Sequence, residues 1–188
     1  MRSYTKTSLI KYTYLFLPIL LNGCSTSVEQ TPSPAPPIEI STTDLTARLS
    51  AHFIKEPATQ PEKDQNALVG YAIDKNLDVK RTASGMYYVI LIEGNGPSPT
   101  ATSKIKAHYE GKLLDGTVFD SSYKRGKPLA FKLNQVIRGW QEALQLLQPG
   151  GKGIFLIPSR IAYGVDGFGP EIPPHTPLIF TVELLEIK

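Results

Sequence analysis

The chain has 188 residues, of which 41% are hydrophobic and 20% charged, the size and balance of one globular domain with accessory segments. Its formal net charge of +3 comes from Arg2, Lys6 and Lys11, because residues 1–23 contain no acidic residue. Without that segment the charge is zero, so composition gives no electrostatic reason to expect nucleic-acid binding. The single cysteine, Cys24, excludes an internal disulfide and a cysteine-based zinc site.

Residues 1–23 have the features of a secretory signal. A basic start precedes residues 12–21, an apolar stretch of about ten residues that is too short to cross a bilayer as a helix. The Leu-Asn-Gly-Cys motif that follows resembles the lipobox of bacterial lipoproteins. The resemblance implies cleavage before Cys24, acylation of its thiol and new amine by palmitate-like chains, and stable anchoring to the cell envelope. Ser25 stands where an aspartate would mark inner-membrane retention, which favours the outer membrane and leaves its periplasmic or surface face open. The alternative is an ordinary signal peptide or a free cysteine.

Three further segments follow the predicted signal. Residues 24–40 are rich in Pro, Ser and Thr, and the alternating prolines favour an extended tether. Residues 41–83 are predicted to form a short helical extension, and residues 84–188 the main domain.

The extension shows helical spacing in two pieces. Apolar residues recur every three to four positions in residues 44–54, with Thr43 or Asp44 as the cap, and again in residues 66–76. Pro-rich residues 56–61 separate the two. The helices either form a homodimer or pack on the chain's own body, and the pattern leaves both alternatives open.

The pattern changes to period two and short apolar runs from Met86 onward. Only residues 136–147 have a clear helical face, which the Pro-Gly-Gly at 149–151 ends. The predicted fold class is therefore α+β, an antiparallel curled sheet wrapped over one short helix. The predicted strands are residues 86–92, 104–114, 118–122, 130–133, 153–157 and 178–187.

Several kinds of catalytic site are excluded by the residues present. The three histidines, His52, His108 and His175, lie far apart in unlike contexts, so no triad or metal spacing joins them and each is predicted to have a surface or structural role. The glycine-rich residues 164–169 lack the Lys-Ser/Thr that a phosphate loop needs. We expect neither a metal nor a cofactor.

What remains is a set of aromatic residues that alternate with Gly and Pro turns, which suggests a pocket lining. The only tryptophan, Trp140, follows Val-Ile-Arg-Gly at the start of the predicted helix. With the aromatic residues upstream and the Ala-Tyr-Gly and Ile-Pro-Pro-His segments at 162–164 and 172–175, this order and spacing resemble the FKBP-type peptidyl-prolyl isomerases. The resemblance covers residues 84–188. Together with the lipobox, it is a resemblance to the lipoprotein members of this family, which are similar to macrophage infectivity potentiators.

The resemblance implies a role for each residue of this pocket. Trp140 would be the floor under a proline ring, and Tyr109 a wall beside the reacting bond. Asp120 would lie near the twisting amide. The Tyr163 hydroxyl and the Ile137 N–H would donate to substrate carbonyls. The other predicted substrate-binding residues are Phe119, Phe131, Val136, Phe180 and, as a gate, Ile172.

Structural alternatives exist for these residues. The aromatic side chains could be core residues, Tyr163 could only stabilise its loop, and Asp120 could cap a turn or pair with Arg125. Three positions depart from the best-known family members and put partner choice and drug affinity in doubt: Leu129, Phe168 and Glu171.

Proline isomerisation suits such a pocket because it needs no covalent intermediate. A planar amide is more charge-separated than a twisted one, so a dry apolar pocket favours the twisted form. The expected function is isomerisation of X-Pro bonds during folding of cell-envelope proteins, with proline-containing polypeptides as substrates and rapamycin-like macrolides as ligands of the same pocket. The alternative is a binding module with little turnover.

Overall fold

The computed structural model describes residues 41–188, which lie within a single unit. The predicted signal peptide, Cys24 and the tether therefore lie outside the described residues. Within the described part, no helix is both long and apolar enough to cross a membrane.

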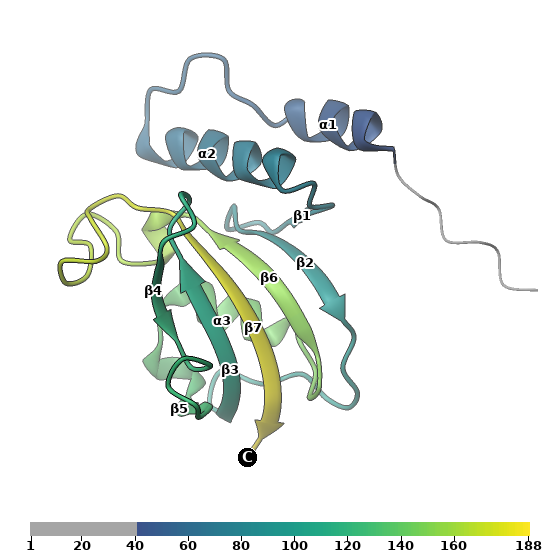
Figure 1. Ribbon diagram of the computed structural model, residues 1–188, viewed down its shortest axis with the longest axis vertical. Helices are drawn as coiled ribbons and strands as arrows, with labels where there is room; N and C mark the ends of the chain where they lie inside the picture. Colours follow the sequence, from purple (N-terminus) through teal and green to yellow (C-terminus); the bar gives the residue numbers. More distant parts are fainter. Residues whose placement is uncertain (1–40) are drawn as a thin grey trace, which may run out of the picture. The chain divides into compact units, whose positions relative to one another are not determined.

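A curved, seven-stranded antiparallel sheet forms the domain, and its two longest strands, β3 and β7, lie side by side (Figure 1). Its order is β1-β2-β6-β7-β3-β4, and β5 pairs with the first half of β3. The strands are β1 (Lys80–Arg81), β2 (Tyr87–Ile92), β3 (Lys104–Lys112), β4 (Val118–Ser121), β5 (Leu129–Lys132), β6 (Lys152–Ile157) and β7 (Leu178–Ile187). This is the predicted α+β class.

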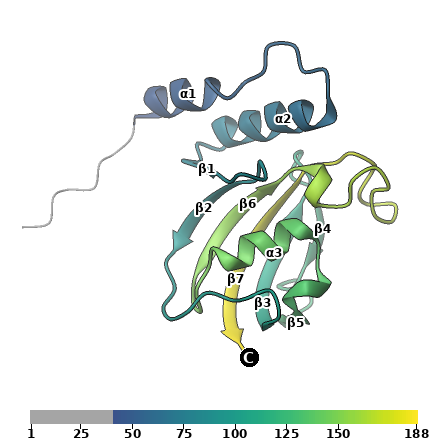
Figure 2. The same cartoon turned by 180° about the vertical axis from the view of Figure 1, so that it is seen from behind.

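One face of the sheet is covered by the helix α3 (Arg138–Gln145), which Figure 2 shows lying across the strands. Trp140, Ala143 and Leu144 share its buried face because they are three and four residues apart. Gly139 allows the close approach, since a Cβ there would lie 2.4 Å from Cγ2 of Ile157 on β6. The main core forms between this helix and the sheet.

The opposite face of the sheet holds a second core, which the N-terminal helices α1 (Thr42–Ser50) and α2 (Gln60–Asp74) complete. Successive side chains of a strand point to opposite faces, so Tyr87 of β2 turns toward these helices while Tyr88 turns toward α3. Leu49 of α1 and Leu68 of α2 are fully buried there. Within one chain the extension thus packs on its own sheet, and homodimerisation stays a prediction.

The boundaries of the extension differ from the predicted ones. Helix α1 begins after Ser41, whose side chain accepts a hydrogen bond from Thr43 N, and ends at Ser50, so Phe53 is left 44% exposed. Helix α2 begins six residues earlier than predicted, because Pro61 occupies the first turn of the helix, where its missing N–H costs nothing.

The main domain differs from prediction in smaller ways. Helix α3 begins at Arg138, after a short 3₁₀ turn (Leu133–Gln135). The two-residue strand β1 was not predicted, since two residues show no period.

Candidate active site

A pocket of about 260 Å³ opens between the N-terminal end of α3 and the curled sheet. This volume suits a single side chain or ring, so a larger ligand would place only one part of itself inside. Its walls are mostly aromatic and its polar groups are few. The lining residues are Tyr109, Phe119, Asp120, Leu129, Gln135, Val136, Ile137, Trp140, Tyr163 and Phe180.

The floor of the pocket is Trp140, which is 5% exposed and is surrounded by other rings. Its ring centroid lies 4.9 Å from that of Tyr109 and 5.3 Å from that of Phe180, with interplanar angles of 84° and 86°. Edge-to-face pairs of this kind each contribute about 0.5–1.5 kcal/mol beyond the area that they bury. The floor is therefore held in one orientation from two sides.

The aromatic walls come from neighbouring strands whose register brings them together at Gly111. This residue of β3 lies opposite Asp120 of β4 and Phe180 of β7. A Cβ at Gly111 would lie 2.6 Å from Cζ of Phe119, so only glycine leaves space for the rings. Phe119 and Phe180 then meet edge to face at 5.6 Å.

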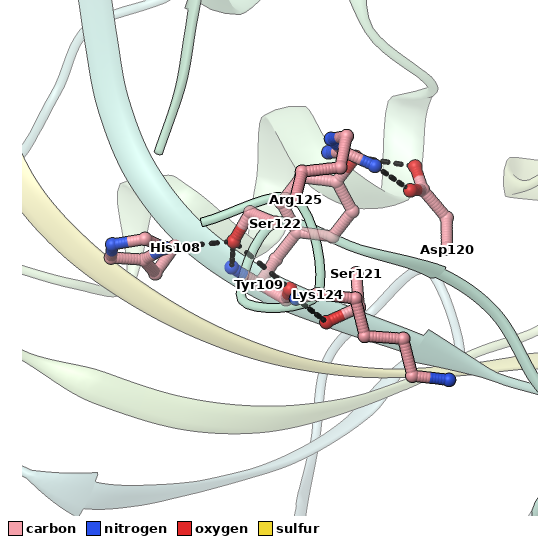
Figure 3. A network of polar contacts seen from close by, with 7 residues as sticks. All are labelled: His108, Tyr109, Asp120, Ser121, Ser122, Lys124 and Arg125. Atoms are coloured by element: carbon pink, nitrogen blue, oxygen red, sulfur yellow. Dashed lines mark hydrogen bonds and ion pairs between the residues drawn. The ribbon is translucent and has the colours of Figure 1, made fainter. Parts of the chain in front are cut away.

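The acidic group of the pocket belongs to a three-residue network, drawn in Figure 3. The Tyr109 hydroxyl donates a hydrogen bond to Asp120 Oδ2, and Arg125 pairs with Asp120 Oδ1. Arg125 also donates to the Tyr109 hydroxyl at 2.7 Å. Asp120 therefore forms the ion pair with Arg125 that the sequence left open as a structural alternative. Its side chain is 40% exposed and also lines the pocket.

Tyr109 is a proton donor over a wide pH range. Burial, and then the hydrogen bond to Asp120, raise the pKa of Tyr109 to about 12. The hydrogen bonds that Arg125 makes to Tyr109 and, to a smaller extent, to Asp120 raise the pKa of its guanidinium. Both groups keep their protons near neutral pH.

Behind this network lies Ser122, a fully buried residue that sequence reasoning missed (Figure 3). Its Oγ accepts from Tyr109 N at 2.8 Å and lies 2.9 Å from Nδ1 of His108. These bonds fix the turn after β4 against β3 and so hold Asp120 and Tyr109 in register. His108, stacked on Tyr123 at 4.6 Å, has the structural role that was predicted.

The second potential donor to a ligand, Tyr163, lies on the loop that follows the short 3₁₀ helix η2 (Ser159–Ile161). Burial is the larger cause, and the charge of Asp120 the smaller, of the raised pKa of Tyr163. Its ring stacks on Phe168, with centroids 4.8 Å apart and an interplanar angle of 24°. Phe168 is 61% exposed, so it extends the apolar wall beyond the pocket rim.

The other predicted donor is the backbone N–H of Ile137, the residue before α3. Its carbonyl accepts from Trp140 N at 3.0 Å and Gln141 N at 3.1 Å, which begins the helix. Its own N–H donates to no other group among residues 41–188. Ile137 is one of the lining residues, so this N–H lies beside the pocket without a partner among the described residues.

Two predicted substrate-binding residues are not among the residues that line this cavity, and their role in binding stays a prediction. Phe131 on β5 packs against Trp140, with ring centroids 5.5 Å apart, and lines an adjacent groove. Ile172 is only 2% exposed and packs in the main core, while its backbone pairs with Phe168. In their place the lining includes Leu129 and Gln135. The position of Gln135 directly before Val136 was the only signal for it.

The described residues contain no group of three side chains that could hold a metal ion. The pocket offers hydrogen-bond donors, one carboxylate and a desolvated aromatic surface. Such a site can stabilise a conformation of a bound amide, and it has no paired nucleophile and base.

Comparisons with known proteins agree with this geometry. Residues 96–185 match the family described as FKBP-type peptidyl-prolyl cis-trans isomerase. The chain is 38% identical over 179 residues to the macrophage infectivity potentiator of Trypanosoma cruzi, covering 95% of this chain and 83% of that one. It is 49% identical over 113 residues to the FKBP-type 22 kDa peptidyl-prolyl cis-trans isomerase of Escherichia coli K12, covering 60% of this chain and 55% of the relative.

Solved structures give the same result. FkpA from Escherichia coli superposes with a TM-score of 0.63 at 37% identity, over 78% of this chain and 65% of that one. A peptidyl-prolyl cis-trans isomerase from Pseudomonas syringae superposes with a TM-score of 0.61 at 35% identity, over 72% of this chain and 98% of that one.

Proposed function

Because the chain belongs to the FKBP-type peptidyl-prolyl cis-trans isomerase family, we propose that its aromatic pocket receives the proline ring of a polypeptide and accelerates rotation about the preceding X-Pro bond. The observation that carries this proposal is the arrangement of Asp120, Tyr109 and Tyr163 around the buried ring of Trp140.

The barrier to be lowered is the partial double-bond character of the amide, about 18–20 kcal/mol. Rotation removes charge separation from the amide, so transfer from water to the apolar floor over Trp140 favours the twisted state over the planar one. A thousandfold acceleration requires about 4 kcal/mol of such preference. Desolvation and a few directed hydrogen bonds are of that size.

The polar groups of the pocket supply the directed hydrogen bonds. The Tyr163 hydroxyl and the Ile137 N–H donate to substrate carbonyls and hold the chain on both sides of the proline. Asp120, oriented by Tyr109 and Arg125, places its carboxylate beside the rotating amide. Because these groups are fixed before substrate arrives, little reorganisation is needed during rotation.

The proposal extends to where the isomerase works. The lipobox motif at Cys24 supports an exported protein anchored by acyl chains, with residues 24–40 as a tether and residues 41–83 as an extension before the domain. Uncatalysed isomerisation takes tens to hundreds of seconds and can limit folding. Folding polypeptides of the cell envelope, reached from the outer membrane, are therefore the proposed substrates.

Macrolides of the rapamycin type are proposed to compete for the same pocket. Trp140 and the surrounding rings support this, whereas the exposed Phe168 and Glu171 alter the rim that such ligands touch. We expect inhibition that is weakened relative to family members with the usual rim.

The test measures isomerisation of Leu-Pro and Ala-Pro reporter peptides by a soluble form beginning at Ser25. Asp120→Ala and Tyr163→Phe should each lower kcat/KM, rapamycin should inhibit, and Tyr71→Phe on α2 should behave as wild type. A folded protein without acceleration, or variants that match wild type, would refute the proposed role of the pocket.

The anchor is tested separately. In bacteria expressing the full chain, labelled palmitate should be incorporated into the wild type but not into Cys24→Ser, and only the wild type should sediment with outer membranes. Incorporation that survives Cys24→Ser, or release of the wild type as a soluble protein, would refute the anchor and leave the isomerase proposal intact.

A further inference from the structure

A buried carboxylate joins the N-terminal extension to the main domain. Asp64 on α2 is only 1% exposed, and its two oxygens are satisfied by neutral donors rather than by a cation. Oδ2 accepts from Ser159 N at 2.7 Å and from Ser159 Oγ at 2.6 Å, and Oδ1 accepts from Gln60 Nε2 at 2.7 Å. A buried polar group is costly unless it is hydrogen-bonded, so these three hydrogen bonds are what allow Asp64 to be buried.

The partner of Asp64 is the first residue of the turn that leads to Tyr163. The Ser159 carbonyl accepts from Ala162 N at 2.9 Å and from Gly164 N at 2.8 Å. Tyr163 therefore lies between two residues whose amides converge on one carbonyl. Whatever fixes Ser159 also fixes the backbone from which the Tyr163 side chain extends.

A second, longer contact reaches the other end of the same loop. Gln60 in the first turn of α2 also places Nε2 3.5 Å from the carbonyl oxygen of His175. His175 N in turn donates to the Gly164 carbonyl at 2.8 Å. The first turns of α2 thus lie against both ends of the segment that carries Tyr163.

We propose that Asp64 is a positioning residue for the isomerase reaction: through Ser159 it holds the Tyr163 hydroxyl at the place where a substrate carbonyl is bound. The inference rests on the proposed function, in which that hydroxyl donates to substrate. Asp64 precedes the residues 96–185 that match the family, so the helical extension becomes part of the catalytic unit rather than a spacer. Misplacement of a donor by about 1 Å can cost up to a hundredfold in rate.

The first test is a double-mutant cycle in kcat/KM. Asp64→Ala should lower kcat/KM roughly tenfold, within the range that misplaced groups show. In a Tyr163→Phe background the same change should have almost no further effect, because the hydroxyl that it positions is gone. Asp64→Asn, whose amide oxygen can still accept from Ser159, should recover most of the activity. Asp74→Ala at the exposed end of the same helix is the matched control.

The second test measures the contact between Asp64 and Ser159 without using activity. Hydrogen exchange at the Ala162 and Gly164 amides should be severalfold faster in Asp64→Ala than in wild type, while amides of β7 stay protected. If Asp64→Ala does not fold, Ser159→Ala removes the hydroxyl alone and should show the same two changes in smaller measure.

The outcomes separate the two proposals. Unchanged kcat/KM in folded Asp64→Ala or Ser159→Ala, or effects that add to those of Tyr163→Phe, would overturn the positioning role while leaving the isomerase site standing. A wild type without acceleration would overturn the proposed function instead. Unchanged hydrogen exchange at Ala162 and Gly164 would show that Asp64 does not fix this turn, whether or not the protein is active.

Discussion

Gly111 of β3 lies directly opposite Phe180 of β7, and a Cβ on Gly111 would lie 2.8 Å from Cε1 of that ring. The same Cβ would lie even closer to Phe119, so two walls of the pocket depend on one missing methyl group. The strands cannot move apart to make room because β3 pairs with β7 along almost its whole length.

Gly111→Ala should therefore disturb the pocket and the fold together. Overpacking of this kind costs about 1–3 kcal/mol, so urea unfolding should show a loss of that size together with a lower kcat/KM. Gly70→Ala on α2 is the control: its Cβ would meet only Phe53 Cζ at 3.9 Å, and replacing a helical glycine should be neutral or stabilising. Full activity and stability in Gly111→Ala would contradict the tight approach.

Tyr109→Phe separates the hydrogen bond to Asp120 from ring packing. The ring contact with Trp140 is kept while the donor to the carboxylate is lost. Hydrogen bonds to charged groups contribute about 1.5–3 kcal/mol, and the 40% exposure of Asp120 places this bond at or below the lower limit. We therefore expect kcat/KM to fall by roughly two- to tenfold, and the free energy of unfolding by no more than about 1.5 kcal/mol. Tyr88→Phe, on the same sheet but outside the pocket lining, should leave kcat/KM unchanged.

Stability should fall steeply at alkaline pH. Burial raises the pKa values of Tyr109 and Tyr123 to about 12, from an ordinary value of 10.0. Between these values the unfolded chain has lost protons that the folded chain keeps, so the free energy of unfolding decreases as pH rises. The stabilisation is complete below pH 10 and is lost through pH 12.

Urea unfolding measured at intervals from pH 8 to 11.5 checks this expectation. Tyr109→Phe should lose less stability over the range than wild type, because one of the two tyrosines whose pKa is raised to about 12 is absent. A wild-type curve that is flat above pH 10 would contradict the raised pKa values.

Phe168→Ala should act on substrate binding and leave folding intact. Its ring is 61% exposed and stacks on Tyr163, so its removal should change stability by no more than about 0.5 kcal/mol. Loss of an aromatic contact worth about 0.5–1.5 kcal/mol should raise KM roughly two- to tenfold with kcat retained. Phe53→Ala, which removes an aromatic side chain 44% exposed on the N-terminal segment, is the matched control. A fall in kcat without a change in KM would argue that Phe168 orients Tyr163 instead.

Local patterns predicted the main domain well because its periods are unambiguous. The alternation in residues 178–187 and the helical face around Trp140 each suit one kind of element. The strand order, in which β6 and β7 lie between β2 and β3, was not predicted. The extension was harder, since Pro61 was interpreted as a break although the first turn of a helix accepts proline.

The chain by itself determined the type of each main element and the aromatic character of the pocket, because apolar periodicity and turn residues are local properties of the sequence. Only the tertiary structure decided that Asp120 pairs with both Tyr109 and Arg125, and that Gln135 joins the lining. It alone also joined Asp64 to Ser159, 95 residues further along the chain. Such contacts depend on how distant segments come to lie side by side, and no period or motif in either segment encodes the distance between them.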